Sequence, residues 1–445
     1  MSSVSLSTSN SSSNQVFVAR APARLDVIGG IADYSGSLVL ESTLACGTTA
    51  SVRLSDSNTI SISSTLLLTG DSFGVHMPIS IFHDADGGLL SFEQANSTLT
   101  SDKQHRWSAY AAGCIYVLLA SGWLESTALQ GMDISISSDV PLGAGVSSSA
   151  SMEVAVMFGV AGAFGIQMDG MEVARLCQIV ENRVVGAPCG IMDQVTCSLG
   201  KANSLLALEC RPHNLLGNVA IPKGWSFSGI DSGVKHSVGG SKYGRARIGA
   251  FMGLQIVRFI TGRNLDYLCE LSPSEWSTIS DQVPEHLSGA EFFEKRTTYP
   301  DPISKPTMDE TYSVRLCTEH PILENARVAK FRELLETANE SNQQTNLIEA
   351  GKLMYEAHQS YSDRVDLGCP ETDKLVRICQ ELGPECGVFG AKITGGGSGG
   401  CVAILCSTDG VSRLEEIAQK YREATGRKPS ILTGSSDGAA WSHSG

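Results

Sequence analysis

A segment rich in glycine and serine could bind phosphate in this sequence. It reads Pro141-Leu-Gly-Ala-Gly-Val-Ser-Ser-Ser-Ala-Ser151. Glycines let a backbone approach a ligand closely, and the N-terminus of a following helix offers unpaired N–H groups to an anion. A simple turn with an N-cap serine has a similar composition. The segment is neither a Walker A loop nor a dinucleotide fingerprint, so it indicates a different class of phosphate-binding loop.

Three further segments combine glycines with polar or charged residues. They are residues 21–34, 186–194 and 392–400. The first places Arg24 and Asp33 beside a Gly-rich bend. The second embeds Asp193 among apolar residues and glycines, shortly after an expected helix that carries Glu181; a lone acid of this kind is more often a cap or surface residue. The third contains five glycines before an expected strand, which suggests close backbone approach to a ligand.

The hydrophobic pattern predicts the elements that must position these segments. Expected strands are 133–139, 205–210, 225–230 and 401–406, and expected helices are 149–163, 171–185, 245–260, 346–361 and 411–425. Residues 272–308, rich in Pro and Ser, predict an irregular or partly helical excursion. We expect a disordered tail over 1–15, an N-terminal domain over 16–215 and a C-terminal domain over 216–445, because 445 residues exceed a usual single core.

Composition limits the partners. The formal net charge of −14 and the lack of a basic cluster argue against nucleic acid. No apolar run is long enough to span a membrane. Thirteen cysteines without C-x-x-C spacing argue against disulfides and a zinc site, and favour a reducing, cytoplasmic location.

Taken together, the motifs resemble those of the GHMP kinases. Asp139 to Ser151 is similar to the ATP loop of that family, and Lys392 to Cys401 to its third motif. Gly190 to Gln194 and Asp231 to Ser237 narrow the resemblance to galactokinases and plant-type L-arabinokinases, closest to the kinase domain of the latter. It extends from about Val16 to the C-terminus. It implies an α+β fold of two domains, one like ribosomal protein S5 domain 2 and one ferredoxin-like, with ATP and sugar bound between them.

The resemblance also implies roles for individual residues. Asp193 would accept the proton of the anomeric hydroxyl of a sugar, with Arg24 beside it as an electrostatic partner. Sugar contacts are implied for Arg24, Asp33, Gly190, Asp193 and Tyr243. Magnesium would be held by Ser149 and Glu181, although a helix cap and a solvent-facing acid remain the alternative. The ATP contacts implied are Gly143, Gly145, Ser147, Ser148, Ser149, Gly396 and Gly397.

One departure from the galactokinase pattern bears on the substrate. Galactokinases typically show Gly-Glu-His-Thr-Asp-Tyr, in which Glu and His reach toward the C6 hydroxymethyl group of the sugar. Gly30 and Ile31 stand in their place here. We therefore expect an ATP- and Mg²⁺-dependent sugar 1-kinase that prefers L-arabinose, which lacks that group. Galactokinase activity is the alternative, and a catalytically silent sensor of sugar and ATP is the alternative of another class. A monomer is expected.

Overall fold

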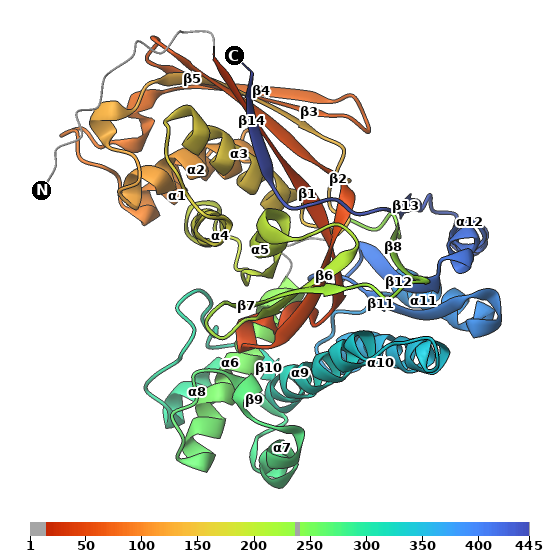
Figure 1. Cartoon of the computed structure of the whole chain (residues 1–445). Helices are drawn as coiled ribbons and strands as arrows, with labels where there is room; N and C mark the ends of the chain where they lie inside the picture. Colours follow the sequence, from red (N-terminus) through yellow and green to blue (C-terminus); the bar gives the residue numbers. More distant parts are fainter. Residues whose placement is uncertain (1–14, 236–240, 445) are drawn as a thin grey trace, which may run out of the picture.

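The computed structural model describes residues 15–235 and 241–444 and has two lobes joined along a shared core (Figure 1). The expected tail, up to residue 14, and the end of the 231–237 segment lie outside the described residues. The strands are β1 (Val16–Ile28), β2 (Leu38–Ser55), β3 (Thr59–Leu66), β4 (Ser72–Pro78), β5 (Gly131–Ser138), β6 (Ser204–Glu209), β7 (Asn214–Ala220), β8 (Trp225–Asp231), β9 (His286–Ser288), β10 (Thr311–Ser313), β11 (Val388–Ile393), β12 (Cys401–Ser407), β13 (Ser430–Leu432) and β14 (Ala440–Ser444).

Helices cover the sheets and fill much of the second lobe. They are α1 (Phe92–Thr100), α2 (Ser108–Ala120), α3 (Ser148–Ala163), α4 (Gly170–Ile179), α5 (Met192–Leu199), α6 (Ser241–Thr261), α7 (Pro273–Ile279), α8 (Gly289–Lys295), α9 (Val314–Glu336), α10 (Gln343–Asp363), α11 (Pro370–Leu382) and α12 (Leu414–Thr425). The expected helices and strands are all present, and the excursion over 272–308 is partly helical, as predicted.

The first lobe is built on an eight-stranded sheet. Its strand order is β14-β1-β2-β5-β3-β4, with β6 paired to β2 and β7 to β6. Only the β3–β5 pair is parallel among these described strands. Ile134 and Ile136 of β5 are buried, as the alternating pattern predicted, and they share a core with α2, α3 and α4. The end of β5 and the start of α3 thereby hold the phosphate-loop candidate between fixed elements.

The second sheet has the order β11-β12-β8-β13, and each neighbouring pair is antiparallel. Numbered along the chain, this is the 2-3-1-4 order of a ferredoxin-like βαββαβ unit. One face packs on α11 and α12, and the other shares a core with β1, β2, α9 and α10. The ends of β1 and β11 therefore meet where the two sheets join.

The expected domain boundary at residue 215 falls inside a strand. β7 crosses it and pairs with β6, so the first sheet continues to Ala220. The chain later returns to this sheet, because β14 pairs with the start of β1. The boundary was expected in a connection between Pro212 and Pro222; those prolines flank β7 and Gly217 interrupts it, so its local sequence does not indicate a strand.

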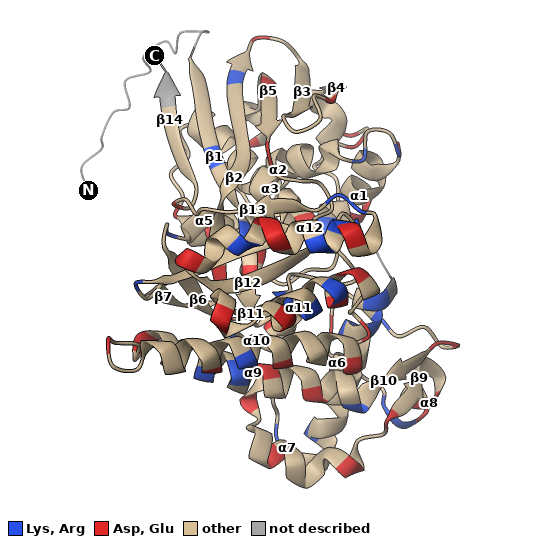
Figure 2. Ribbon diagram, turned by 90° about the vertical axis from the view of Figure 1, so that its right-hand side faces the viewer, with Lys and Arg blue, Asp and Glu red and all other residues tan. Residues whose placement is uncertain are grey.

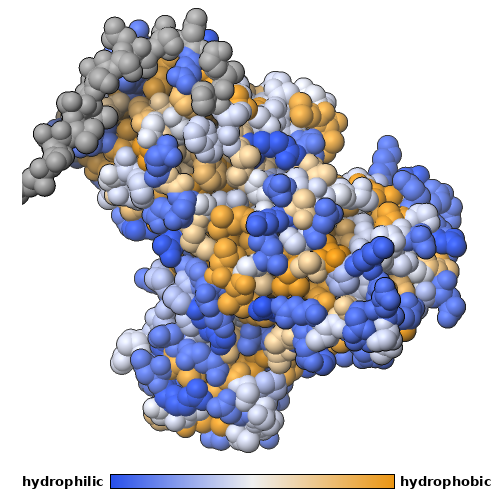
Figure 3. Space-filling model, viewed as in Figure 1, coloured by the Kyte–Doolittle hydropathy of each residue, from blue (hydrophilic) through white to orange (hydrophobic). Residues whose placement is uncertain are grey.

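The surface shows no single dominant charge on the face seen in Figure 2, where acidic and basic side chains alternate along α11 and α12. In Figure 3, apolar residues gather near the middle of the molecule, at the level of β6 and β7 in Figure 1. β7 contributes the exposed Leu215 and Leu216.

All thirteen cysteines lie in the described residues and are free. No described helix is long and apolar enough to cross a membrane.

Candidate active site

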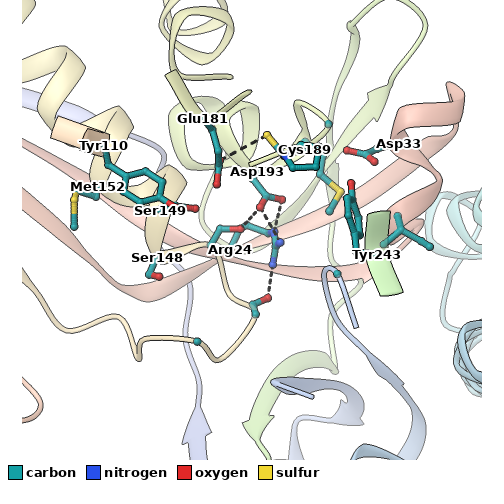
Figure 4. Close-up of a pocket in the computed structure, with 18 of the residues that line it drawn as sticks. Arg24, Asp33, Tyr110, Ser148, Ser149, Met152, Glu181, Cys189, Asp193 and Tyr243 are labelled. Carbon is teal, nitrogen blue, oxygen red and sulfur yellow. Dashed lines mark hydrogen bonds and ion pairs between the residues drawn. The ribbon is translucent and has the colours of Figure 1, made fainter. Parts of the chain in front are cut away.

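A cavity of about 330 Å³ lies between the two lobes. Its lining includes the glycine and serine loop before α3, the end of β1, the start of α5 and Gly396 from the second lobe. Figure 4 shows the serines and Tyr110 at one end, Asp33 and Tyr243 at the other, and Arg24 and Asp193 between them. The cavity thus has a hydroxyl- and ring-lined end, a charged centre and a second polar end.

At the centre, Arg24 holds Asp193 through two parallel hydrogen bonds. The Nε atom of Arg24 donates to Oδ1 at 2.8 Å, and Nη2 donates to Oδ2 at 3.0 Å. Arg24 is 3% exposed, whereas the Asp193 side chain is 21% exposed and faces the cavity. Asp193, Glu41 and Asp26 stabilise the guanidinium and raise its pKa against the desolvation that would lower it. The pair therefore presents a fixed carboxylate backed by a permanent cation.

The loop between β5 and α3 is tied to this pair. The Nη1 atom of Arg24 donates to the Gly145 carbonyl at 2.7 Å. Ser147, at the N-cap position of α3, makes no capping hydrogen bond; its hydroxyl instead donates to Oδ2 of Asp193. Ser147 also has a φ of 60°, a conformation uncommon outside glycine. The cap expected of an ordinary turn is thus absent, which leaves the first N–H groups of α3 without a side-chain cap.

Beside the start of α3, Glu181 is buried in a π-helical turn that extends α4. Burial, followed by the charge of Asp193, raises its pKa to about 7, while hydrogen bonds from Ser149, Cys189 and Gln194 oppose this shift. The Nε2 atom of Gln194 donates to Oε2 of Glu181 at 2.7 Å. Glu181 is 3% exposed and lines the cavity, so it does not face open solvent.

These groups suit a hard divalent cation. Ser149 supplies a hydroxyl and Glu181 a carboxylate, and both line the cavity. A cation here would stabilise the ionised form of the Glu181 carboxylate, which burial otherwise disfavours. Among the described residues no group of three or more His, Cys, Asp or Glu could hold a metal. That sparse protein donor set fits magnesium, which usually takes one or two carboxylates together with phosphate oxygens and water.

Asp33 lines the opposite end of the cavity, in a short 3₁₀ helix over Gly30–Ser35. Its carboxylate lies directly on Gly190, since a Cβ on that glycine would stand 1.5 Å from Oδ2. Burial, then Asp193, raises the pKa of Asp33 to about 7, and Arg247 opposes this shift. Asp33 and Gly190 therefore pack directly against each other. Any larger residue at position 190 would displace the Asp33 carboxylate.

Position 30 must be glycine because Tyr361, which is distant in the sequence, packs directly against it. A Cβ at this position would stand 1.8 Å from the hydroxyl oxygen of Tyr361. The Tyr361 hydroxyl accepts from the Ile31 N–H at 3.1 Å and donates to the Gly395 carbonyl at 3.0 Å. Tyr361 thus fills the space of a side chain at position 30, while Ile31 lines the cavity with an apolar group.

The structure brings together all the site residues predicted from sequence except one. The exception is Gly397, which is absent from the cavity lining and whose Cα faces Leu367 and Tyr361. Apart from Ile31, sequence reasoning did not single out the apolar lining, which is formed by Trp107, Tyr110, Leu142, Met152, Pro188, Cys189 and Met192. Met152 could have been predicted from the sequence, because it lies three residues after Ser149 on the same helix face. Trp107 and Tyr110 could not have been predicted, since they lie far in sequence from every motif.

Comparison with known proteins agrees with the motifs. The model of the GHMP kinase N-terminal domain matches residues 109–201, and that of the C-terminal domain matches residues 332–424. L-arabinokinase from Arabidopsis thaliana is 38% identical over 487 residues; the match covers 96% of this chain and 46% of that protein. The chain therefore spans less than half the length of this relative.

Solved structures share the fold. Galactokinase from Lactococcus lactis, solved with galactose, has a TM-score of 0.74 at 22% identity, covering 96% of this chain and 95% of that one. Mevalonate kinase from Methanococcus jannaschii has a TM-score of 0.56 at 17% identity, covering 94% and 98%. The two domain matches, the shared fold and the motifs gathered in one cavity show that the chain belongs to the GHMP kinases.

Proposed function

We propose that this chain transfers the γ-phosphoryl group of ATP to the anomeric hydroxyl of a sugar, and that the sugar is L-arabinose. The observation that carries the proposal is the position of the Arg24–Asp193 pair, between the phosphate-loop candidate and the Asp33 end of one cavity. The two substrates would bind at the two ends and react at the pair. The names of the relatives, L-arabinokinase and galactokinase, support the same class of reaction.

In this proposal Asp193 accepts the proton of the anomeric hydroxyl at its cavity-facing carboxylate. The oxygen then bonds to the γ-phosphorus while the bond from that phosphorus to the β-bridging oxygen breaks. Arg24 holds Asp193 and lies where negative charge develops, which is the main demand of phosphoryl transfer. Because Arg24 also binds the Gly145 carbonyl, the base and the phosphate loop keep a fixed separation.

ATP would lie along the loop before α3, with its phosphates near Gly143, Gly145 and the serines. Trp107, Tyr110 and Leu142 line the same cavity and supply the flat apolar surface that a purine ring needs. Magnesium would be held by Ser149 and Glu181 together with the phosphates, and would neutralise charge on them. Gln194 fixes the orientation of Glu181 through the hydrogen bond that its Nε2 atom donates to Oε2.

Glu181→Gln is expected to raise the magnesium concentration needed for half-maximal activity by about tenfold or more, since it removes the only carboxylate of the proposed site. Binding of Mn²⁺, followed by electron paramagnetic resonance with a non-hydrolysable ATP analogue, should weaken in parallel. Glu172→Gln is the matched control, because Glu172 is a partly exposed acid on α4 that pairs with Arg175. Parental metal dependence in Glu181→Gln would remove Glu181 from the site.

L-arabinose is expected to have a kcat/KM roughly tenfold to hundredfold above that of D-galactose. Tyr361 fills the space at Gly30, and Ile31 lines the cavity, so these two positions offer the O6 hydroxyl of galactose no polar side chain. Kinetics with L-arabinose, D-galactose, L-fucose and D-glucuronate measure the preference directly. A value for D-galactose equal to or above that for L-arabinose would favour the galactokinase alternative.

The sensor alternative differs in turnover rather than in binding. A sensor would bind both ligands and leave the sugar unphosphorylated. The serine loop, Arg24 and Asp193 are all present in one cavity, which favours an enzyme. Absence of ADP release with every sugar, in the presence of measurable sugar and ATP binding, would support the sensor.

A further inference from the structure

A buried ion pair joins the two lobes where the ends of β1 and β11 meet. The Nζ atom of Lys392 donates to Oδ2 of Asp26 at 2.6 Å, and both side chains are 0% exposed. The two residues lie 366 positions apart in the sequence. Neither is among the residues that line the cavity, so the pair acts on the site only through its neighbours. Two charges withdrawn from water in this way need further hydrogen bonds, and Asp26 makes them.

Asp26 uses its remaining acceptor capacity on the backbone of two loops. Its Oδ1 atom accepts from the Gly30 N–H at 3.1 Å, and Oδ2 accepts from the Gly395 N–H at 3.1 Å. Gly30 begins the 3₁₀ helix that carries Asp33, and Gly395 directly precedes Gly396. Asp33 and Gly396 both line the cavity. One carboxylate therefore holds two cavity-lining loops that follow strands of different sheets.

Two further side chains fasten the same two loops. The hydroxyl of Thr394 accepts from the Asp26 N–H at 2.9 Å and donates to the Asp26 carbonyl at 3.1 Å. The hydroxyl of Tyr361 joins the Ile31 N–H to the Gly395 carbonyl. These two links are made by neutral groups, whereas hydrogen bonds to an ionised acceptor are roughly twice as strong. Asp26 is therefore the strongest link between the loops.

The loop of the third motif, residues 394–400, packs directly on the phosphate-loop candidate. A Cβ on Gly395 would stand 2.9 Å from the Gly145 carbonyl oxygen and 3.1 Å from Nη2 of Arg24. A Cβ on Gly400 would stand 2.7 Å from the Ala144 carbonyl oxygen. Since Arg24 also donates to the Gly145 carbonyl, a displacement of the third-motif loop would reach both groups.

Resting on the proposed function, we propose that Asp26 is a positioning residue for phosphoryl transfer, and that its ion pair with Lys392 fixes the third-motif loop relative to the loop of Asp33. The third-motif loop lies against the phosphate-loop candidate, and Asp33 lines the sugar end. Their separation sets the distance between the attacking oxygen and the γ-phosphorus. Because a displacement of about 1 Å can lower a rate by about 10²-fold, this separation must be held firmly.

Asp26→Asn removes the charge and leaves the side-chain volume nearly unchanged. Its single acceptor oxygen cannot serve both N–H groups, and Lys392 loses its partner. We expect kcat to fall about tenfold to hundredfold, while the KM values for sugar and ATP stay within a few-fold of the parent. The melting temperature should fall by about 5–10 °C, because a buried charge is left unpaired.

Asp26→Asn/Lys392→Met separates positioning from stability. With no charge of the pair left unpaired, this double variant should regain most of the lost melting temperature. Its kcat should remain about tenfold or more below that of the parent, because the link between the loops is still missing. A purely stabilising pair would instead let kcat recover together with the melting temperature. Glu349→Gln/Lys352→Met is the matched control, since these residues form an exposed pair on α10, and it should behave as the parent.

Hydrogen exchange of the ligand-free proteins tests the same link without turnover. Measured by mass spectrometry, exchange in residues 29–35 and 394–400 should be about tenfold faster in the Asp26→Asn/Lys392→Met variant than in the parent. If the parent phosphorylates none of the sugars, the proposed function fails and the exchange rates alone decide whether Asp26 holds the loops. The role of Asp26 would be overturned by unchanged exchange in both loops, or by a kcat of the double variant within a few-fold of the parent. A double variant as unstable as Asp26→Asn would overturn it as well.

Discussion

Asp193→Asn is expected to lower kcat by about 10²–10⁴-fold, the range typical of losing a general base. Asparagine is nearly isosteric, and with its carbonyl oxygen at the Oδ2 position it can still accept hydrogen bonds from Nη2 of Arg24 and from Ser147, losing only the bond from Nε. The geometry of the centre should therefore survive while the proton acceptor is lost. The affinity for ATP should remain within a few-fold of the parent, because the phosphate-loop candidate is unchanged.

Steady-state kinetics and a fluorescent nucleotide titration measure these two outcomes separately. Asp133→Asn is the matched control, because Asp133 is an exposed acid of β5 that pairs with Arg53 at the surface. Such surface pairs contribute little to stability, so this control should behave as the parent. Turnover in Asp193→Asn within a few-fold of the parent would mean that phosphoryl transfer here needs no carboxylate base.

Arg24→Ala is expected to lower kcat by roughly 10²–10³-fold and to raise the KM for the sugar, since it removes the cation beside the developing charge. It should also lower the free energy of unfolding by about 3–5 kcal/mol, the usual cost of breaking a buried ion pair. Besides Asp193, Arg24 faces Glu41, whose Oε2 lies 3.5 Å from Nε. Glu41 is fully buried and would lose its cationic neighbour.

Arg24→Lys separates the charge from the hydrogen-bond geometry. Lysine keeps the charge but cannot hold both Asp193 oxygens and the Gly145 carbonyl as the guanidinium does. We expect the stability to recover substantially and kcat to stay about tenfold or more below the parent. In the double variant with Asp193→Asn, the two effects on kcat should be strongly non-additive because the residues act as a unit. Additive losses would contradict the paired role of Arg24 and Asp193.

Local patterns predicted the elements well, because each reports on neighbours a few residues apart. The alternation of β5, the glycines after it and the apolar face of α3 together located the phosphate-loop candidate. β7 was not predicted because the prolines that flank it and the glycine within it are typical of a connection, and only pairing with β6 makes it a strand. Family motifs then supplied Arg24 and Asp193, which are 169 residues apart and meet only through the fold.

Long-range contacts outside the motifs could not be predicted from the sequence. Tyr361 reads as an ordinary residue of an amphipathic helix, yet its hydroxyl binds the Ile31 N–H, 330 residues away. Arg247 and Asp301 are 54 residues apart, and the acid lies in a Pro-rich excursion with no regular pattern. A single sequence without tertiary information carries no signal for such pairs. These are also the contacts that shape the Asp33 end of the cavity.

Under the proposed function, the packing of Tyr361 against Gly30 constrains how the substrate range of this chain could evolve. An acidic side chain at position 30 cannot enter while the tyrosine hydroxyl occupies that volume. The tyrosine cannot lose its hydroxyl without leaving the Ile31 N–H and the Gly395 carbonyl without that partner. We therefore expect each single step toward a hexose pocket to be deleterious by itself and the two positions to be epistatic. A directed-evolution library that varies residues 30 and 31 alone would stall, whereas one that also varies residue 361 opens the route.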